Sequence, residues 1–274
     1  MYFKSSVWHK YIYFSGDNGA RHDRISIKDD VFFKMPVNIP TLPEQKKIAN
    51  FLTLIDKRID KQKELIKILK KYKKGVLYLF FSKKIPNKKL FELIKIGKAG
   101  GTPLSSKPEY YNGDIPFLSI SDMTSQGKYL FSTTKYISDK GLNNSVAWIV
   151  PVNSLIVSMY ASYGLVAINK IELATSQAMF NIITNVSSDI EYLYYYLNYL
   201  SIIGYYDKLV STGTQPNLNA IKIKNIPVYI PIELREKEKI TYILSSFDEV
   251  ENKAINLLNK LLGLKHGLLQ QMFI

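Results

Sequence analysis

A long segment of this chain occurs twice, and this repeat constrains the fold more than any other feature. The first copy runs from Leu42 to Phe81 and the second from Leu234 to Phe273. Apolar, charged and glycine positions coincide when the two copies are aligned at one fixed offset. The matched pairs are Ile48 with Ile240, Leu52 with Leu244, Asp56 with Asp248, Leu69 with Leu261, Gly75 with Gly267, and Phe81 with Phe273.

Each copy has the apolar spacing of a coiled-coil helix. Steps of four and three lead from Ile48 to Val76 and from Ile240 to Leu268, and seven of the nine positions in each series are apolar. Such a helix would be roughly 55–60 Å long. A small globule cannot bury so long and narrow a seam, so we expect each copy to pair with the other; the alternative is two unrelated core helices. The expected interface residues are Leu52, Ile55, Leu69, Leu244, Phe247 and Leu261.

The composition is that of a folded protein in a reducing compartment. Of 274 residues, 46% are hydrophobic and 13% aromatic, which excludes general disorder. The absence of cysteine excludes structural disulfides and cysteine-bound zinc. No apolar run is long enough to span a membrane, and the N-terminus lacks the apolar core of a signal peptide. We therefore expect a cytoplasmic protein with no membrane partner.

The net charge of +14 is concentrated on the first repeat. Residues 43–82 carry eleven Lys/Arg against four Asp/Glu, whereas residues 234–274 carry six against five and residues 83–232 carry fourteen against nine. A basic excess favours a polyanionic partner such as nucleic acid. The competing interpretation is a lysine-rich face that only keeps a coiled coil soluble.

Between the two repeats the pattern changes to that of a sheet-rich domain, so we predict an α+β fold. Gly, Pro, Asn and Ser separate short β-rich runs. Residues 1–41, with a strand-like run at Val31–Phe33, are too few to form a core of their own. The predicted strands are 115–120, 145–150, 155–159, 165–168 and 180–184.

One helix interrupts the predicted sheet. It runs from Asp189 to Leu200, with Ser188 and Glu191 spaced as a capping box. Its five tyrosines could stack on bases. We favour the interpretation that they pack this half-buried helix on the sheet.

The sequence offers no recognisable catalytic centre. The three histidines, His9, His22 and His266, are scattered, which argues against a histidine metal cluster. A phosphate-binding loop of the Gly-x-x-x-x-Gly-Lys-Ser/Thr type is missing, as is an Asn-Pro-Pro-Tyr-type methyltransferase motif. We therefore expect a protein with no catalytic activity, no metal and no cofactor.

Several motifs, in this order, resemble the DNA-specificity subunit of type I restriction–modification systems. Ile39-Pro40 and Leu42-Pro43-Glu44-Gln45-Lys46-Lys47-Ile48-Ala49 precede the first long helix. Gly100-Gly101-Thr102-Pro103 is followed by the segment from Pro108 to Met123. Gly213-Thr214-Gln215-Pro216-Asn217-Leu218 precedes the second long helix. Together these motifs cover most of residues 37–274.

The resemblance implies a division of the chain into four parts. Residues 83–233 would be a complete target-recognition domain, and residues 1–41 the remnant of a first one. Residues 42–82 and 234–274 would be the helices of an antiparallel coiled coil. The implied partners are double-stranded DNA, methylating subunits and a motor-nuclease subunit. The chain departs from the family pattern in two places. The remnant has Arg21-His22-Asp23 where the complete domain has Gln215-Pro216. The second long helix has Arg235-Glu236-Lys237 in the region where the first has Pro43 and Gln45.

Candidate DNA-binding residues lie in the loops near the predicted strand ends of residues 83–233. Phosphate contacts position such a domain and base-edge contacts specify sequence, for which Gln, Asn and Lys are suited. For each residue the alternative is a purely structural role in a turn. The candidates are Lys98, Gly101, Thr102, Lys107, Ser119, Asp122, Tyr160, Tyr163, Thr214, Gln215 and Asn217.

Two interpretations of the whole chain remain open. The first is a sequence-specific DNA-binding subunit. The second is a coiled-coil assembly or regulatory fragment with little DNA binding of its own. In addition, the apolar residues of 1–41 lead us to predict a homodimer, whose two recognition domains would read a palindromic, interrupted target.

Overall fold

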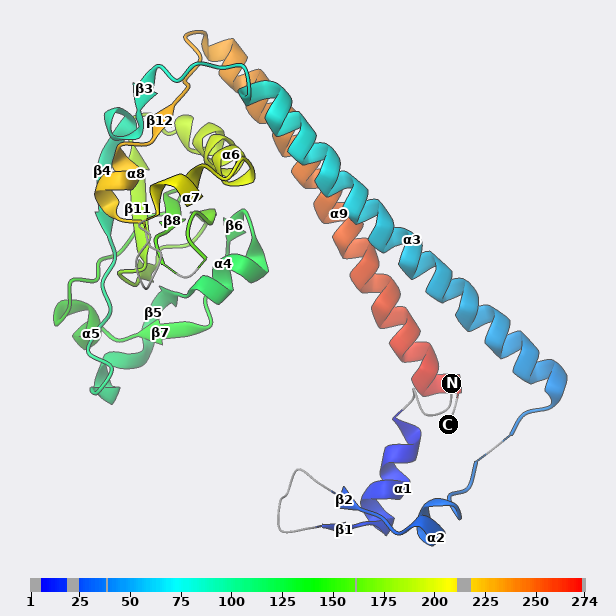
Figure 1. Cartoon of the computed structure of the whole chain (residues 1–274). Coiled ribbons are helices and arrows are strands. Elements are labelled where there is room, and N and C mark those ends of the chain that lie inside the picture. The colour runs from blue at the N-terminus through cyan, green and yellow to red at the C-terminus, as the bar shows by residue number, and fades with distance from the viewer. Residues whose placement is uncertain (1–5, 19–24, 38, 161, 211–217, 273–274) are drawn as a thin grey trace. The chain divides into compact units, whose positions relative to one another are not determined.

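The structure, a computed structural model, describes residues 6–18, 25–37, 39–160, 162–210 and 218–272 (Figure 1). Its contacts divide the chain into two compact units. The first unit comprises Met1–Lys71 and Phe247–Ile274, and the second comprises Tyr72–Ser246. Both long helices continue from one unit into the other, so each unit is described by itself.

The two copies of the repeat form the two long helices, α3 (Leu42–Phe81) and α9 (Leu234–Met272). At the start of α3, the backbone N–H and hydroxyl of Thr41 both donate to the Glu44 carboxylate, over 3.0 and 2.8 Å. These hydrogen bonds lower the pKa of Glu44. The Glu44 carboxylate thus accepts hydrogen bonds at the N-terminus of α3. Its negative charge also interacts favourably with the positive end of the helix dipole.

In the first unit, α3 and α9 pack side by side in opposite directions (Figure 1). Asp56 of α3 forms an ion pair with Lys265, and Lys70 with Glu251, so ascending positions on one helix meet descending positions on the other. All the predicted seam positions of this unit are buried or half-buried. The most buried of these positions are Leu52, Ile59 and Ile66 of α3 and Ala254 and Leu261 of α9. Leu269, next to the predicted position Leu268, is buried as well. The predicted antiparallel coiled coil is confirmed.

The N-terminal part of the first unit is mostly helical. It contains α1 (Val7–Ser15), a two-stranded ribbon of β1 (Asp17–Asn18) and β2 (Ile25–Ser26), and α2 (Asp29–Phe32). The expected strand at Val31–Phe33 is therefore wrong. Asp29 and Asp30 lie in the first turn of α2, where negative charge stabilises a helix. The Tyr11 hydroxyl donates to the Val31 carbonyl over 3.0 Å, which links α2 to α1.

The second unit is built on three sheets, as expected for a sheet-rich domain. The largest has the strand order β4-β11-β8-β9-β6, the next has β10-β5-β7, and β12 pairs with β3. The strands are β3 (Lys88–Lys89), β4 (Ile94–Ala99), β5 (Tyr111–Leu118), β6 (Tyr129–Leu130), β7 (Lys135–Ile137), β8 (Leu155–Ser158), β9 (Val166–Asn169), β10 (Ala174–Thr175), β11 (Met179–Thr184) and β12 (Pro227–Val228).

Four of the five predicted strands correspond to β5, β8, β9 and β11, within a few residues at their ends. The fifth, residues 145–150, is wrong, because this segment contributes only an isolated bridge from Val150 to Leu173. Here the Ser145 side chain accepts a hydrogen bond from the Ala147 N–H over 3.2 Å. Such a local side-chain contact competes with strand pairing.

The predicted tyrosine-rich helix is α6 (Asp189–Ile202), and its tyrosines pack into the core. Tyr192 and Tyr195 are fully buried, and the Tyr192 hydroxyl donates to the Tyr229 carbonyl over 2.9 Å. The packing interpretation is therefore confirmed. The smaller helices are α4 (Ile120–Gln126), α5 (Asp139–Asn143), α7 (Tyr205–Leu209), α8 (Ala220–Lys224) and the 3-10 turns η2 (Leu90–Leu93) and η3 (Pro108–Tyr110).

The predicted capping box of α6 is wrong. Ser188 has helical backbone angles and its side chain forms no capping hydrogen bond. Instead, the Lys237 ammonium donates to Ser188 and to the buried Asp189 carboxylate, over 3.1 and 2.5 Å. The Ser188 and Asp189 side chains are thus bound by a cation from α9, distant in sequence, and not by a contact within α6.

The ends of both long helices enter the core of the second unit. Leu77 and Phe81 of α3 belong to the same buried cluster as Ile240 and Leu244 of α9 and the apolar face of the large sheet. The Phe81 ring centroid lies 5.2 Å from that of Tyr196, in an edge-to-face arrangement. The large sheet and the helix ends therefore share one core.

Candidate nucleic-acid interface

The Gly100–Gly101 turn at the end of β4 packs tightly inside the second unit. The Gly101 N–H donates to the Thr175 carbonyl over 2.8 Å. A Cβ atom on Gly100 would lie 2.1 Å from that carbonyl oxygen, and one on Gly101 would lie 2.5 Å from the Ala147 nitrogen. The close approach that we expected at Gly101 is thus to the domain's own backbone, and its assignment as a DNA contact stays a prediction.

Lys98, next to this turn, presents an exposed and restrained charge. Its ammonium lies 4.5 Å from the centroid of the Trp148 ring. The indole N–H of Trp148 in turn donates to the Ala99 carbonyl over 3.1 Å. The cation–π contact holds the charge at the end of the strand without removing it from solvent.

Thr102 brings in a residue that the sequence reasoning missed. Its hydroxyl donates to Oε1 of Gln177, and both side chains are exposed. Gln177 lies in the tight turn between β10 and β11, seventy-five residues away in sequence. No local motif marked Gln177, because its partner comes from the neighbouring loop.

Lys107, Ser119 and Asp122 have different surroundings. Lys107 is exposed just before η3. Ser119 and Asp122 form the capping box of α4, and Asp122 is 2% exposed. Burial by itself would raise the pKa of Asp122, but hydrogen bonds from Ser119 and Thr134 outweigh it and lower the pKa. The structure thus gives Ser119 and Asp122 a role in the fold, and their assignment as DNA contacts stays a prediction.

The two candidate tyrosines also differ. Tyr160 is 39% exposed after β8. The Tyr163 hydroxyl donates to the Asp207 carboxylate over 2.8 Å, and this hydrogen bond raises its pKa. Tyr163 therefore links the loop after β8 to α7. The exposed Tyr160 remains a candidate for contact with DNA. Thr214, Gln215 and Asn217 lie outside the described residues.

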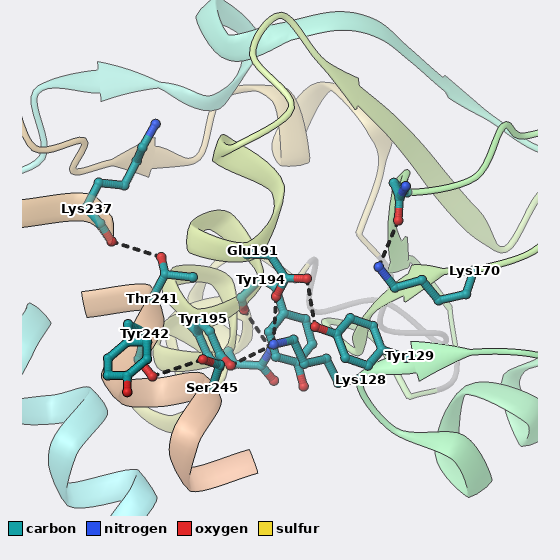
Figure 2. A network of polar contacts seen from close by, with 12 residues as sticks. Lys128, Tyr129, Lys170, Glu191, Tyr194, Tyr195, Lys237, Thr241, Tyr242 and Ser245 are labelled. Atoms are coloured by element: carbon teal, nitrogen blue, oxygen red, sulfur yellow. Dashed lines mark hydrogen bonds and ion pairs between the residues drawn. The ribbon is translucent and has the colours of Figure 1, made fainter. Parts of the chain in front are cut away.

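Lys128 is a second residue that the sequence reasoning missed. Its side chain is buried in a polar network (Figure 2). Its ammonium lies 2.7 Å from the Glu191 carboxylate and 2.6 Å from the Tyr195 hydroxyl. It also faces the rings of Tyr129, Tyr194 and Tyr195 at 4.4–5.2 Å. The Tyr129 hydroxyl donates to Glu191 as well, over 2.8 Å. The network joins β6 to α6, so Lys128 has a structural role.

The predicted helix interface residues lie along the seam. Leu52, Leu244 and Leu261 are buried, and Ile55, Leu69 and Phe247 are half-buried. Among the described residues, no group of three or more His, Asp or Glu side chains could hold a metal ion. Within the same residues, the structure contains no helix that is long and apolar enough to cross a membrane.

Known proteins share both this sequence pattern and this fold. The family described as Type I restriction modification DNA specificity domain matches residues 83–262. The chain is 31% identical over 156 residues to the type I restriction enzyme MjaIX specificity subunit of Methanocaldococcus jannaschii, covering 56% of this chain and 36% of that protein. It is also 31% identical over 169 residues to the HindI specificity subunit of Haemophilus influenzae, covering 60% of this chain and 37% of that protein.

Among solved structures, the S subunit of the type I restriction–modification system from M. genitalium has a similar fold. The TM-score is 0.60 at 17% identity, over 91% of this chain and 66% of that one. The chain thus spans little more than a third of the two curated relatives and about two thirds of this structural neighbour. Because the family match covers residues 83–262, this chain belongs to the type I restriction modification DNA specificity family.

Proposed function

We propose that this chain is the DNA-recognition subunit of a type I restriction–modification complex and directs methylation and cleavage to one target sequence. Residues 83–233 would bind double-stranded DNA as the recognition domain. The observation that carries this proposal is the shared core of the sheet-rich domain and the ends of α3 and α9. A rigid join of this kind suits a subunit that must orient a DNA-reading domain with respect to its partners.

The outer surface of the helix pair supports the proposed binding of methylating subunits. In the first unit, both helices carry large apolar side chains that the seam leaves exposed, and apolar surface of this kind is available to a partner. Leu65 of α3 and Leu257 of α9 are matched positions of the repeat, 44% and 40% exposed. The other exposed apolar residues on the described part of the two helices in this unit are Leu42, Phe51, Leu54, Ile68, Val250, Leu262 and Leu264.

We propose that the chain itself is not catalytic and acts in the cytoplasm. Methyl transfer and cleavage would belong to the methylating and motor-nuclease subunits. The features that support this are the lack of a catalytic motif in the sequence and the names of the curated relatives, which are called specificity subunits.

The N-terminal residues support the proposed homodimer. Helix α1 and Ile25 line an apolar groove of about 700 Å³. Tyr13 and Phe14, which contribute to this groove, are 62% and 82% exposed. A second copy of the chain would cover this surface and supply a second recognition domain. A two-fold dimer would then read two inverted, identical half-sites.

The competing candidate is an assembly or regulatory fragment that binds DNA poorly. The exposed apolar side chains of the helix pair, such as Leu65 and Leu257, favour it. Methylome sequencing of cells that express the chain with its methylating subunits separates the two candidates. A modified, interrupted palindrome supports recognition by a homodimer. No modified motif, with a monomer in light scattering, supports the fragment.

A further inference from the structure

Two loops of the second unit meet at one end of the large sheet and form a fixed base. The Gly100 N–H donates to the Met179 carbonyl over 3.1 Å, and the Gly101 N–H donates to the Thr175 carbonyl over 2.8 Å. Beneath them, the buried Asn181 amide donates to the Thr175 hydroxyl over 2.8 Å. The turn that carries Gln177 is therefore held from both sides by hydrogen bonds.

On this base, an exposed side chain is held in one orientation. The Thr102 hydroxyl donates to Oε1 of Gln177, so the two N–H groups of the amide remain for a ligand. An exposed glutamine normally samples many rotamers, and restricting it costs conformational entropy. The hydrogen bond from Thr102 makes this restriction before any ligand binds. The Gln177 side chain therefore presents hydrogen-bond donors, which suit a negatively charged acceptor.

A cation lies on the same strand end. Lys98 precedes Thr102 by four residues, and its ammonium is held over the Trp148 ring at 4.5 Å. A donor-only amide and a fixed ammonium form the combination that binds phosphate oxygens. Reading of a base edge would instead use an amide whose donor and acceptor are both free.

We propose that Gln177 and Lys98 bind phosphates of the DNA backbone, and that Thr102 is the residue that positions Gln177. This inference rests on the proposed function. It assigns the Gly100–Gly101 end of the sheet to backbone anchoring. Sequence reading then belongs to other loops of the recognition domain.

The test is fluorescence anisotropy with the full chain, on a mixed-sequence duplex and on the target duplex, in a titration from about 50 to 200 mM salt. Gln177→Ala should weaken binding to both duplexes equally, by roughly tenfold, because a hydrogen bond to a charged group is lost. Lys98→Ala should reduce the slope of log K against log salt by about 1. Lys95→Ala is the matched control, because Lys95 is an exposed lysine of the same strand that lies further from the Gly100–Gly101 turn.

The positioning role of Thr102 has its own readout. Thr102→Val should weaken binding, Thr102→Ser should restore it, and Thr102→Val should add nothing in a chain that already carries Gln177→Ala. A loss confined to the target duplex, or no loss in Gln177→Ala, overturns the proposed contact while the proposed function stands. A wild-type chain that binds neither duplex contradicts the proposed function itself, and the contact with it.

Discussion

The two halves of the helix pair bury the same kind of seam against different neighbours. In the paired half, residues 42–71 of α3 and 247–272 of α9, the seam side chains of the two helices cover one another. In the embedded half, residues 72–81 and 234–246, the seam side chains belong to the core of the sheet-rich domain. The repeat is thus one pattern that serves two packing environments.

The polar contacts of the two halves differ in the same way. In the paired half the Lys70–Glu251 ion pair is open to solvent, with the lysine side chain 58% exposed. In the embedded half the Lys237–Asp189 pair is buried, with side chains 9% and 8% exposed. Exposed pairs contribute little to stability, whereas breaking a buried pair is costly. Substitutions in the embedded half should therefore affect the domain, and those in the paired half the assembly.

The largest effect is expected from a charge in the seam of the paired half. Leu69→Asp or Leu261→Asp would place an unpaired carboxylate among apolar side chains and cost several kcal/mol. Hydrogen exchange should show loss of protection in residues 42–71 and 247–272, with the sheet-rich domain still protected, and binding of the methylating subunits should fail. Asn256→Asp, at an exposed position of α9, is the control. Unchanged assembly in Leu69→Asp would contradict the functional role of the coil.

In the embedded half, Lys237→Ala should destabilise the sheet-rich domain by about 3–5 kcal/mol, because it leaves the buried Asp189 carboxylate unpaired. Chemical denaturation of the full chain measures the change. Lys239→Ala, two residues further along α9 at an exposed position, should change little. Equal stability of the two variants would mean that the ion pair does not stabilise the domain.

A second substitution in the embedded half tests the contribution of apolar packing to its stability. Leu244 is fully buried, and Leu244→Ala should lower the free energy of unfolding by about 2–5 kcal/mol through lost contacts and a cavity. Tyr242→Ala is the matched control, because its ring is 73% exposed, and a surface change of this kind stays within about 0.5 kcal/mol. Similar costs for both variants would show that α9 is not embedded at Leu244.

The smallest effect is expected at the polar seam position of the paired half. The Gln62 amide donates to the Ala254 carbonyl over 2.9 Å, and these two residues are equivalent positions of the repeat. Gln62→Leu should change stability by about 1 kcal/mol or less, because the lost hydrogen bond and the gained apolar contact nearly cancel. Thermal unfolding followed by circular dichroism measures this change. A drop of several degrees together with an altered oligomer would identify Gln62 as a determinant of register.

Of the candidate site, the sequence identified the exposed Lys98, Thr102, Lys107 and Tyr160 by residue type and by proximity to strand ends. It could not identify Gln177, whose partner Thr102 lies in another loop, or the structural roles of Asp122 and Gly101. These assignments depend on which loops lie side by side, and hydrogen bonds between distant segments decide that.

The two long helices and most of the strands were predictable from the sequence, because they follow from periodicity along the chain. The antiparallel direction of the helix pair was implied only by the family resemblance. The tertiary structure decided the rest. Val76 and Leu244 belong to the seam pattern, but they pack in a domain core rather than in a free coiled coil. Val31 and Phe32 have strand-like side chains, yet they lie in a helix. Local propensity is a weak preference, and the acidic first turn of α2 and the contact of Val31 with Tyr11 favour the helix here.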